Sequence, residues 1–214
     1  MLTELRIPLI GLAGPTGAGK STAAGMLAEL GCGILDGDAL SREITAPGSP
    51  VLAQLATRFG EDICKGESLD RVLLAERAFA SEKARQDLNS ITHPAITALA
   101  LTKAKALQGK RALVFDAAAL LESGDMAQAC DHFIIITAPE ALRLTRILQR
   151  GGISEQAARQ RIAAQTHMDF TPPAGVGFTV IDSTGGEAVL RDAIEKAFQA
   201  VVSERGTNGN CRCE

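Results

Sequence analysis

The segment Gly14-Pro15-Thr16-Gly17-Ala18-Gly19-Lys20-Ser21 follows the pattern G-x-x-x-x-G-K-[ST] of a phosphate-binding loop. The apolar run at 7–13 precedes it and predicts a buried strand, and the Ala- and Leu-rich run at 22–30 predicts a helix that ends at Gly31. A strand, a glycine-rich loop and a helix in this order form the context that the motif requires. A glycine-rich turn that matches by chance is the alternative, and both flanking elements argue against it.

Each residue type in this loop has a physical reason. Glycines let the backbone turn tightly and bring its N–H groups close to phosphate oxygens, and the following helix directs its partially positive N-terminus to the same place. The Lys20 ammonium can bridge the β- and γ-phosphates, and the Ser21 hydroxyl can bind Mg²⁺. The residues expected to contact the nucleoside triphosphate here are Gly14, Gly17, Ala18, Gly19, Lys20, Ser21 and Thr22.

Composition limits the classes of protein to which the chain can belong. Its 214 residues are 46% hydrophobic and 22% charged, which suits a folded domain and excludes global disorder. A formal net charge of −3 argues against a constitutive nucleic-acid binder. No apolar run reaches membrane-spanning length, so we expect a cytoplasmic protein with no membrane partner. Of the five cysteines, Cys211 and Cys213 form a C-x-C near the C-terminus, more typical of a disordered end than of a metal site.

The order of the predicted elements indicates an α/β fold. Apolar runs at 33–36, 111–116, 132–137 and 178–182 predict four further strands, which alternate with helices and give a five-stranded parallel sheet flanked by helices. The segment 61–107 contains no convincing strand. It reads as helices only, one around 83–91 and another that begins at Thr92-His93-Pro94.

These elements predict a single domain over residues 1–206. A helical insertion at about 61–108 would bind a substrate, and residues 207–214 would form a flexible tail.

Three carboxylates follow or end predicted strands, where ligands bind in open parallel sheets. Asp38 is compatible with two roles, a catalytic base and the N-cap of a helix at 39–44. Asp36 is either a Mg²⁺ ligand through water or a turn residue. Asp116 closes the third strand as a Walker-B acid does, although this signal is weak alone.

A pair of arginine-rich helices follows the fourth strand, at about 139–166, and Gly151-Gly152 joins them. One interpretation is a solvated basic face. The other is a mobile lid whose arginines close over the phosphates, which the phosphate-binding loop in the same chain favours. The arginines concerned are Arg143, Arg146, Arg150, Arg159 and Arg161.

The phosphate-binding loop alone permits a GTPase switch, a mechanical ATPase or a small-molecule kinase. A guanine-binding [N/T]-K-x-D motif is missing, because Thr102-Lys103-Ala104-Lys105 lacks the acid, and the only D-x-x-G lies late, at 182–185. A substrate-binding insertion together with an arginine lid favours the kinase.

The order of the motifs resembles that of the dephospho-CoA kinase family. The segment from Ile10 to Thr22 is similar to the family's I-G-L-T-G-G-I-G-S-G-K-S-T. Further matches are Ile34 to Arg42 (V-I-D-A-D-x-x-x-R), Gly66 to Phe79 (D-G-x-L-D-R-x-x-L…V-F), Leu88 to Pro94 (L-N-x-x-x-H-P) and Asp116 to Glu122 (D-x-P-L-L-F-E). Arg146, Arg150 and Gln165 fall where the family's lid expects them. Arg143 replaces the usual lid Gln, and an Asn is frequent near Ser183.

The resemblance implies a P-loop kinase fold and transfer of a phosphoryl group from ATP to 3′-dephospho-CoA, giving ADP and CoA. By matching position it implies Asp38 as general base, with Lys20 and Arg150 as the other catalytic residues and Arg146 as a further ATP contact. Mg²⁺ would bind Ser21, with Asp36 or Asp116 through water. The implied acceptor contacts are Asp38, Arg42, Arg71, His93 and Glu122.

Two alternatives stay open at this point. One is another P-loop small-molecule kinase with a different acceptor, and the other is a regulator that binds ATP without transferring its phosphoryl group.

Overall fold

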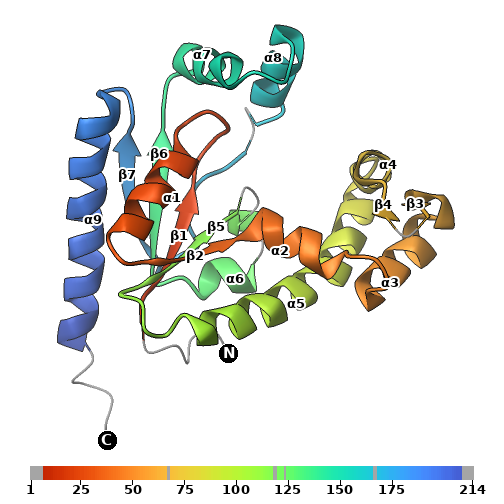
Figure 1. Cartoon of the computed structure of the whole chain (residues 1–214), viewed down its shortest axis with the longest axis horizontal. Coiled ribbons are helices and arrows are strands. Elements are labelled where there is room, and N and C mark those ends of the chain that lie inside the picture. The colour runs from red at the N-terminus through yellow and green to blue at the C-terminus, as the bar shows by residue number, and fades with distance from the viewer. Residues whose placement is uncertain (1–6, 67, 118–119, 123, 166–167, 209–214) are drawn as a thin grey trace, which may run out of the picture. The chain divides into compact units, whose positions relative to one another are not determined.

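The computed structural model describes residues 7–66, 68–117, 120–122, 124–165 and 168–208. The chain divides into two compact units (Figure 1). The sheet unit comprises Met1–Leu35 and Ala104–Glu214, and the helical unit comprises Asp36–Lys103. The predicted substrate-binding insertion at about 61–108 overlaps the helical unit, and its role stays a prediction.

Five strands form one sheet in the order β2-β5-β1-β6-β7. The central β1 pairs in parallel with β5 and with β6, with Leu9 opposite Leu113 and Ile10 opposite His132. The predicted five-stranded parallel sheet is therefore confirmed. The strands are β1 (Leu9–Ala13), β2 (Gly33–Asp36), β5 (Leu113–Asp116), β6 (His132–Thr137) and β7 (Gly177–Asp182).

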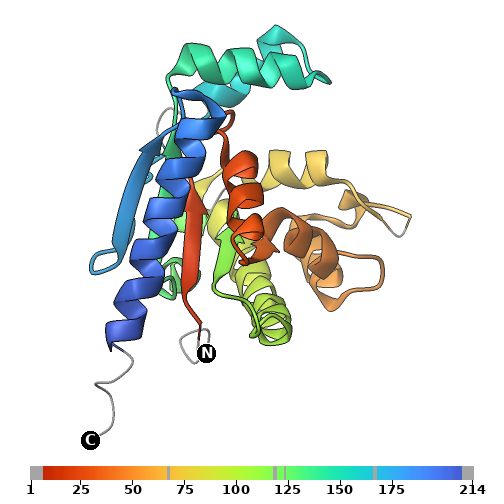
Figure 2. The ribbon, with the colours of Figure 1, turned by 60° about the vertical axis from the view of Figure 1, so that its left-hand side comes forward.

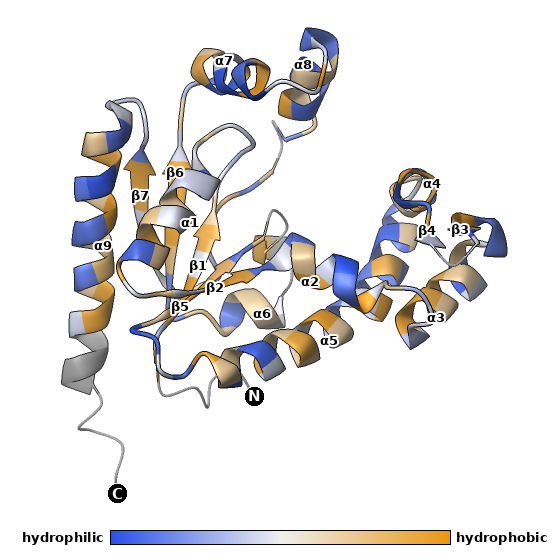
Figure 3. Ribbon diagram, in the orientation of Figure 1, coloured by the Kyte–Doolittle hydropathy of each residue, from blue (hydrophilic) through white to orange (hydrophobic). Residues whose placement is uncertain are grey.

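Helices α1 (Lys20–Glu29) and α9 (Gly186–Asn208) pack together and bury one face of the sheet, as Figure 2 shows. Apolar residues four apart on α9 form the stripe that enters this core, which includes Leu190, Ile194 and Phe198. In Figure 3 the strands are largely orange, whereas α9 carries both colours. This division explains why α9 lies on the sheet with only one side buried.

Helices α7 (Glu140–Arg150) and α8 (Glu155–Ala163) pair through a small core of Ile147, Ala158 and Ile162. Ser154 caps α8, because its hydroxyl accepts the Ala157 N–H at 3.2 Å. The remaining short elements of the sheet unit are the 3₁₀ turn η3 (Leu120–Glu122) and α6 (Asp125–Gln128).

The helical unit has a core of its own, formed by Leu55, Phe59, Ile63, Leu74, Ala78 and Ala84. Ser49 caps α3, and Gly60 ends this helix with φ 104°. The helices of this unit are α2 (Gly37–Ile44), α3 (Pro50–Phe59), α4 (Arg71–Ala78) and most of α5 (Glu82–Ala106), with a 3₁₀ turn η2 (Glu61–Ile63).

Three secondary-structure predictions are wrong. A short antiparallel pair, β3 (Cys64–Lys65) with β4 (Ser68–Leu69), lies in the segment predicted to lack strands. Two-residue strands are too short to give a hydrophobic period, so the pattern could not reveal them. Helix α9 continues to Asn208, beyond the predicted start of the tail, while Cys211 and Cys213 lie outside the described residues.

The third error concerns α5, which is continuous where two helices were predicted. Pro94 lies inside it rather than near its start. Proline removes the hydrogen bond to the carbonyl four residues earlier, that of Ser90. Both residues are exposed, so water can bind this carbonyl and the helix tolerates the proline.

Within the described residues, no helix combines the length and the hydrophobicity that crossing a lipid bilayer requires.

The packing of α9 predicts that Ile194→Ala destabilises the protein strongly, because Ile194 is completely buried in the main core. The expected loss is about 2–5 kcal/mol in the free energy of unfolding, measured by urea denaturation. Val189→Ala is the matched control on the same helix, because the Val189 side chain is 55% exposed. Equal losses for both variants would contradict this packing.

Candidate active site

The loop between β1 and α1 presents backbone N–H groups at the start of a helix. Gly19 is the N-cap of α1, in the left-handed region with φ 109° and ψ 15°. A glycine cap offers no side-chain acceptor, so the first N–H groups of α1 depend on a ligand or on water for hydrogen bonds. Such a helix start binds anions, since the N–H groups and the helix dipole attract negative charge together.

Two other glycines give the loop its shape. Gly14 and Gly17 have φ values of 136° and 81°, which residues with a side chain rarely adopt. A methyl group on Gly17 would lie 2.7 Å from the carbonyl oxygen of Arg143, on α7. The loop therefore packs directly against the first of the arginine-bearing helices.

Lys20 is the first residue of α1, and its ammonium donates to the Gly14 carbonyl at 2.7 Å. This hydrogen bond spans the loop and holds the positive charge over it. Ser21 and Thr22 follow in the first turn of α1 with exposed side chains.

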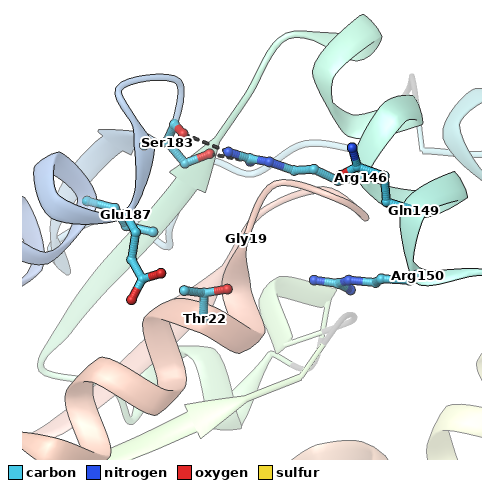
Figure 4. Close-up of a pocket in the computed structure, with 9 residues that line it drawn as sticks. Gly19, Thr22, Arg146, Gln149, Arg150, Ser183 and Glu187 are labelled. Atoms are coloured by element: carbon cyan, nitrogen blue, oxygen red, sulfur yellow. Dashed lines mark hydrogen bonds between the residues drawn. The ribbon is translucent and has the colours of Figure 1, made fainter.

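A cavity of about 330 Å³ opens beside the loop (Figure 4). Both Arg146 and Arg150 of α7 line it, as do Gly19 and Thr22 from the start of α1. The full lining consists of Gly19, Thr22, Arg146, Gln149, Arg150, Ser183, Gly186, Glu187 and Leu190. The structure therefore brings two of the predicted loop residues, Gly19 and Thr22, to one cavity with two of the five predicted lid arginines.

Arg146 is joined to the loop and to the turn after β7. Its Nη1 donates to the Ser183 hydroxyl at 2.7 Å and to the Ala18 carbonyl at 3.1 Å, and its Nη2 donates to the Ser183 carbonyl at 2.8 Å. The two bonds to Ser183 are drawn in Figure 4. Arg150, one turn later on α7, is exposed and lines the cavity.

A second connection runs from the segment after α8. The side-chain oxygen of Gln165 accepts the Thr16 N–H at 2.7 Å. Arg143, at the position of the family's usual Gln, lies against the same part of the loop and has a buried Nε with no hydrogen-bond partner among the described residues. Helix α7 and the segment after α8 thus both contact the loop in this structure.

The carboxylates at the strand ends have different surroundings. Asp36, the last residue of β2, caps α2, because its Oδ1 accepts the Ala39 N–H at 3.0 Å. The capping role considered for Asp38 is therefore wrong: α2 begins at Gly37, two residues earlier than predicted, and Asp38 lies exposed in its first turn. Asp116 ends β5, level with Leu12 of the neighbouring β1.

The remaining acceptor candidates that the structure describes lie in the helical unit. Arg71 begins α4 and donates to the Thr45 hydroxyl at 2.8 Å, at the end of α2. Arg42 is exposed in the last turn of α2. His93 is half-buried within α5, not at the start of a helix. The side chain of Glu122 lies outside the described residues.

The turn that carries Arg71 is held by Asp70. The Asp70 carboxylate accepts the Val72 and Leu73 N–H groups, each at 3.1 Å, and pairs with Lys65 at 2.6 Å. The hydrogen bond from Lys65, followed by that from the Leu73 N–H, lowers the pKa of Asp70 below its ordinary value. The cap is therefore ionised at neutral pH and fixes the start of α4.

Two other kinds of site lack support. Within the described residues, no three His, Cys, Asp or Glu side chains cluster as metal ligands. Cys32 and Cys130 are buried, and desolvation raises the pKa of the Cys32 thiol to about 11 and that of the Cys130 thiol to about 12. Neither thiol is a suitable nucleophile near neutral pH.

Sequence reasoning assigned no role to Ser183 or Glu187, which also line the cavity. Ser183 directly follows the last residue of β7, so the rule that ligands bind beyond the carboxyl ends of strands could have indicated it. Glu187 lies in the first turn of a long helix, where no local pattern distinguishes it from other exposed acids.

The loop geometry predicts that Gly17→Ala weakens ATP binding by about 5- to 150-fold, because the left-handed φ and the contact with Arg143 together cost on the order of 1–3 kcal/mol. Titration calorimetry with Mg-ATP measures this. Gly25→Ala, in the same α1, meets nothing within 4 Å and should leave the affinity unchanged. Unchanged affinity in Gly17→Ala would show that the loop does not bind ATP in this shape.

Comparison with known proteins gives the family. A family model described as dephospho-CoA kinase matches residues 8–170. The chain is 40% identical over 188 residues to the dephospho-CoA kinase of Corynebacterium jeikeium, which covers 87% of this chain and 95% of that protein. It is 39% identical over 189 residues to that of Syntrophotalea carbinolica, with 87% and 88% covered.

A solved structure agrees with this result. The dephospho-CoA kinase from Campylobacter jejuni matches with a TM-score of 0.58 and 25% identity, over 92% of this chain and 98% of that one. The matched residues 8–170 include the loop, the arginines of α7 and the whole helical unit. The chain belongs to the dephospho-CoA kinase family, a family of ATP-dependent phosphotransferases.

Proposed function

We propose that the protein transfers the γ-phosphoryl group of ATP to the ribose 3′-hydroxyl of 3′-dephospho-CoA, giving CoA and ADP, in the cytoplasm. The observation that carries this proposal is the cavity beside the phosphate-binding loop, where Gly19 and Thr22 face Arg146 and Arg150. Membership of the family supplies the acceptor.

Binding of the triphosphate falls to the loop and α1. The N–H groups at the start of α1 and the Lys20 ammonium, held over the loop by Gly14, are positioned to neutralise phosphate charge. Charge stabilisation and positioning should supply most of the barrier lowering, because the transferred phosphoryl group needs little covalent chemistry from the protein.

We propose Mg²⁺ as the metal that accompanies ATP. The Ser21 hydroxyl and the Asp116 carboxylate are hard oxygen donors of the kind that Mg²⁺ prefers, and Mg²⁺ usually keeps several waters and phosphate ligands. Asp36 already uses Oδ1 to cap α2, which leaves its other oxygen for contact through water. When bound, the metal would neutralise charge on the phosphates.

Asp38 is the proposed general base. Its carboxylate would take the proton of the 3′-hydroxyl as this oxygen attacks the γ-phosphorus, and the bridging oxygen would leave with ADP. Asp38 is exposed, and Asp36 performs the capping of α2, so no structural role competes with the catalytic one.

The acceptor would be held by the helical unit. A guanidinium binds phosphate oxygens in a bidentate fashion, which suits Arg42 and Arg71 to the diphosphate of dephospho-CoA. His93 and Glu122 complete the proposed set. Arg150 lines the cavity beside the phosphate-binding loop. From there it would stabilise the negative charge on the phosphoryl group that ATP transfers.

Acceptor-dependent release of ADP from Mg-ATP tests the function, with Lys20→Ala as the blank. The loss of one preorganised donor predicts that Lys20→Ala lowers turnover by about 10²–10³. ADP release that requires 3′-dephospho-CoA supports the proposal. ATP binding with no transfer to this acceptor would contradict it, and transfer to another acceptor would indicate a different small-molecule kinase.

We expect Asp38→Asn to lower the rate of phosphoryl transfer by about 10²–10⁴, because the variant lacks the proposed general base. Its ATP affinity should stay near that of the wild type. Glu43→Gln is the matched control, because Glu43 is an exposed carboxylate on the same helix that pairs with Lys103 at the surface, at 2.6 Å. Its turnover should stay within about twofold of wild type, as surface pairs contribute little. Near-normal transfer by Asp38→Asn would rule out the base.

A further inference from the structure

Ser183 is the most completely buried polar residue near the cavity, with 1% of its surface exposed. It lies in the turn between β7 and α9, 165 residues from the loop that it contacts. Its hydroxyl donates to the Ala18 carbonyl at 2.6 Å and accepts from Arg146 at 2.7 Å, and it lies 3.1 Å from the Thr137 carbonyl. The single O–H of Ser183 is therefore directed at the loop carbonyl, with the Thr137 carbonyl as an alternative acceptor, and the hydroxyl oxygen accepts from α7.

The guanidinium of Arg146 is committed to the same place. It donates to the hydroxyl and the carbonyl of Ser183 and to the carbonyl of Ala18. These acceptors are neutral. They require at most three of the five N–H groups of the guanidinium, so other N–H groups remain for further hydrogen bonds. Arg146 thus contacts the loop at the Ala18 carbonyl. The guanidinium also lines the cavity, so its positive charge can act on a ligand there.

The contact on Ala18 controls the direction of an N–H group. A peptide unit is planar and trans, so its C=O and N–H point in opposite directions. The Ala18 carbonyl belongs to the same peptide as the Gly19 N–H. Because Ser183 and Arg146 both bind this carbonyl, the Gly19 N–H must point away from them, at the N-cap of α1 where an anion would bind.

The Gly19 backbone needs such support. Its φ of 109° lies outside the broad minima of most residues, and even glycine loses entropy when it is held in one conformation. Two hydrogen bonds on the preceding carbonyl, one of them from a cation, restrict this peptide before any ligand arrives.

We propose that Ser183 and Arg146 form a latch that sets the Ala18–Gly19 peptide in the orientation required for ATP, with Ser183 as a positioning residue that acts through the loop. The proposal rests on the ATP site of the proposed function and adds a residue to it. Ligand binding to a preorganised loop avoids the cost of ordering that loop, so the latch contributes to ATP affinity more than to the chemical step.

The test is a double-mutant cycle of Ser183→Ala and Arg146→Ala, with the dissociation constant of Mg-ATP measured by titration calorimetry without any acceptor. Loss of a buried hydrogen bond with a charged group predicts about tenfold weaker ATP binding for Ser183→Ala. In the Arg146→Ala background the same change should weaken binding by clearly less than in the wild type, because the hydrogen bond from Arg146 to the Ser183 hydroxyl is already absent while the bond from Ser183 to the Ala18 carbonyl is still lost. Equal effects of Ser183→Ala in both backgrounds would overturn the latch.

Steady-state kinetics separate positioning from a general loss of structure. Ser183→Ala should raise the KM for ATP about tenfold and leave kcat within about threefold of wild type, as expected for loss of binding energy shared by ground and transition states. Ser183→Thr keeps the hydroxyl and should recover most of the ATP affinity. The matched control is Thr184→Ala, which removes a hydroxyl from the exposed neighbouring residue and should change nothing.

A further variant keeps the test decisive if Ser183→Ala does not fold. Arg146→Lys retains the charge, but one ammonium cannot reproduce the planar fork that reaches the Ser183 carbonyl and the Ala18 carbonyl together. It should weaken ATP binding by about tenfold as well. Unchanged ATP affinity in folded Arg146→Lys would overturn the latch.

The latch and the proposed function fail in different ways. Coupling in ATP affinity without transfer to 3′-dephospho-CoA would leave the latch intact and contradict the function. Normal acceptor-dependent turnover without coupling would contradict the latch alone.

Discussion

The candidate site depends on one peptide unit, between Ala18 and Gly19, at the junction of the central strand β1 and helix α1. Its carbonyl oxygen receives hydrogen bonds from Ser183 and Arg146, and its N–H belongs to Gly19, the N-cap residue of α1. These partners come from the end of β7 and from α7, so three segments distant in sequence meet there. The parallel sheet makes this possible, because it brings the carboxyl ends of its strands to one edge.

The two arginines of α7 differ in their surroundings although both line the same cavity. Arg146 is half-buried and bonded to the protein backbone, whereas Arg150 is exposed one turn later. We infer that Arg146 fixes the conformation of the loop, whereas Arg150 interacts with the bound ligand. Arg143 and Gln165 contact the loop at Gly17 and Thr16, so a lid movement of the predicted kind would have to break contacts with the loop itself.

Much of the fold could be predicted from the sequence because its determinants are local. The loop motif, the apolar strands and the Ser49 and Ser154 caps each lie within a few residues of the structure that they specify. The failures also have local causes. In Asp36-Gly37-Asp38 either acid could cap α2, and only the phase of the helix decides between them. Helix α5 continues through Pro94 because this residue and the carbonyl that loses its hydrogen bond face solvent. The sequence alone does not show which side of the helix is exposed.

The site was predictable only in part, for a similar reason. Lys20, Arg146 and Arg150 stand in patterns that indicate their chemistry. The structure brings the two arginines to one cavity beside the loop, and the Lys20 ammonium donates to the Gly14 carbonyl of that loop. Ser183 carries no such pattern, since its partners lie 37 and 165 residues away. The roles of Asp38, Arg42, Arg71, His93 and Glu122 follow from the family resemblance and stay predictions.

The central claim is that this site moves a phosphoryl group to one hydroxyl of one acceptor. The most direct measurement is to incubate the protein with Mg²⁺, γ-labelled ATP and 3′-dephospho-CoA and to identify the labelled product by chromatography and mass spectrometry. We expect the label to enter a product identical to CoA, with the new phosphate on the ribose 3′-oxygen. A label that remains in ATP, passes to water alone or enters another position of the acceptor would contradict it.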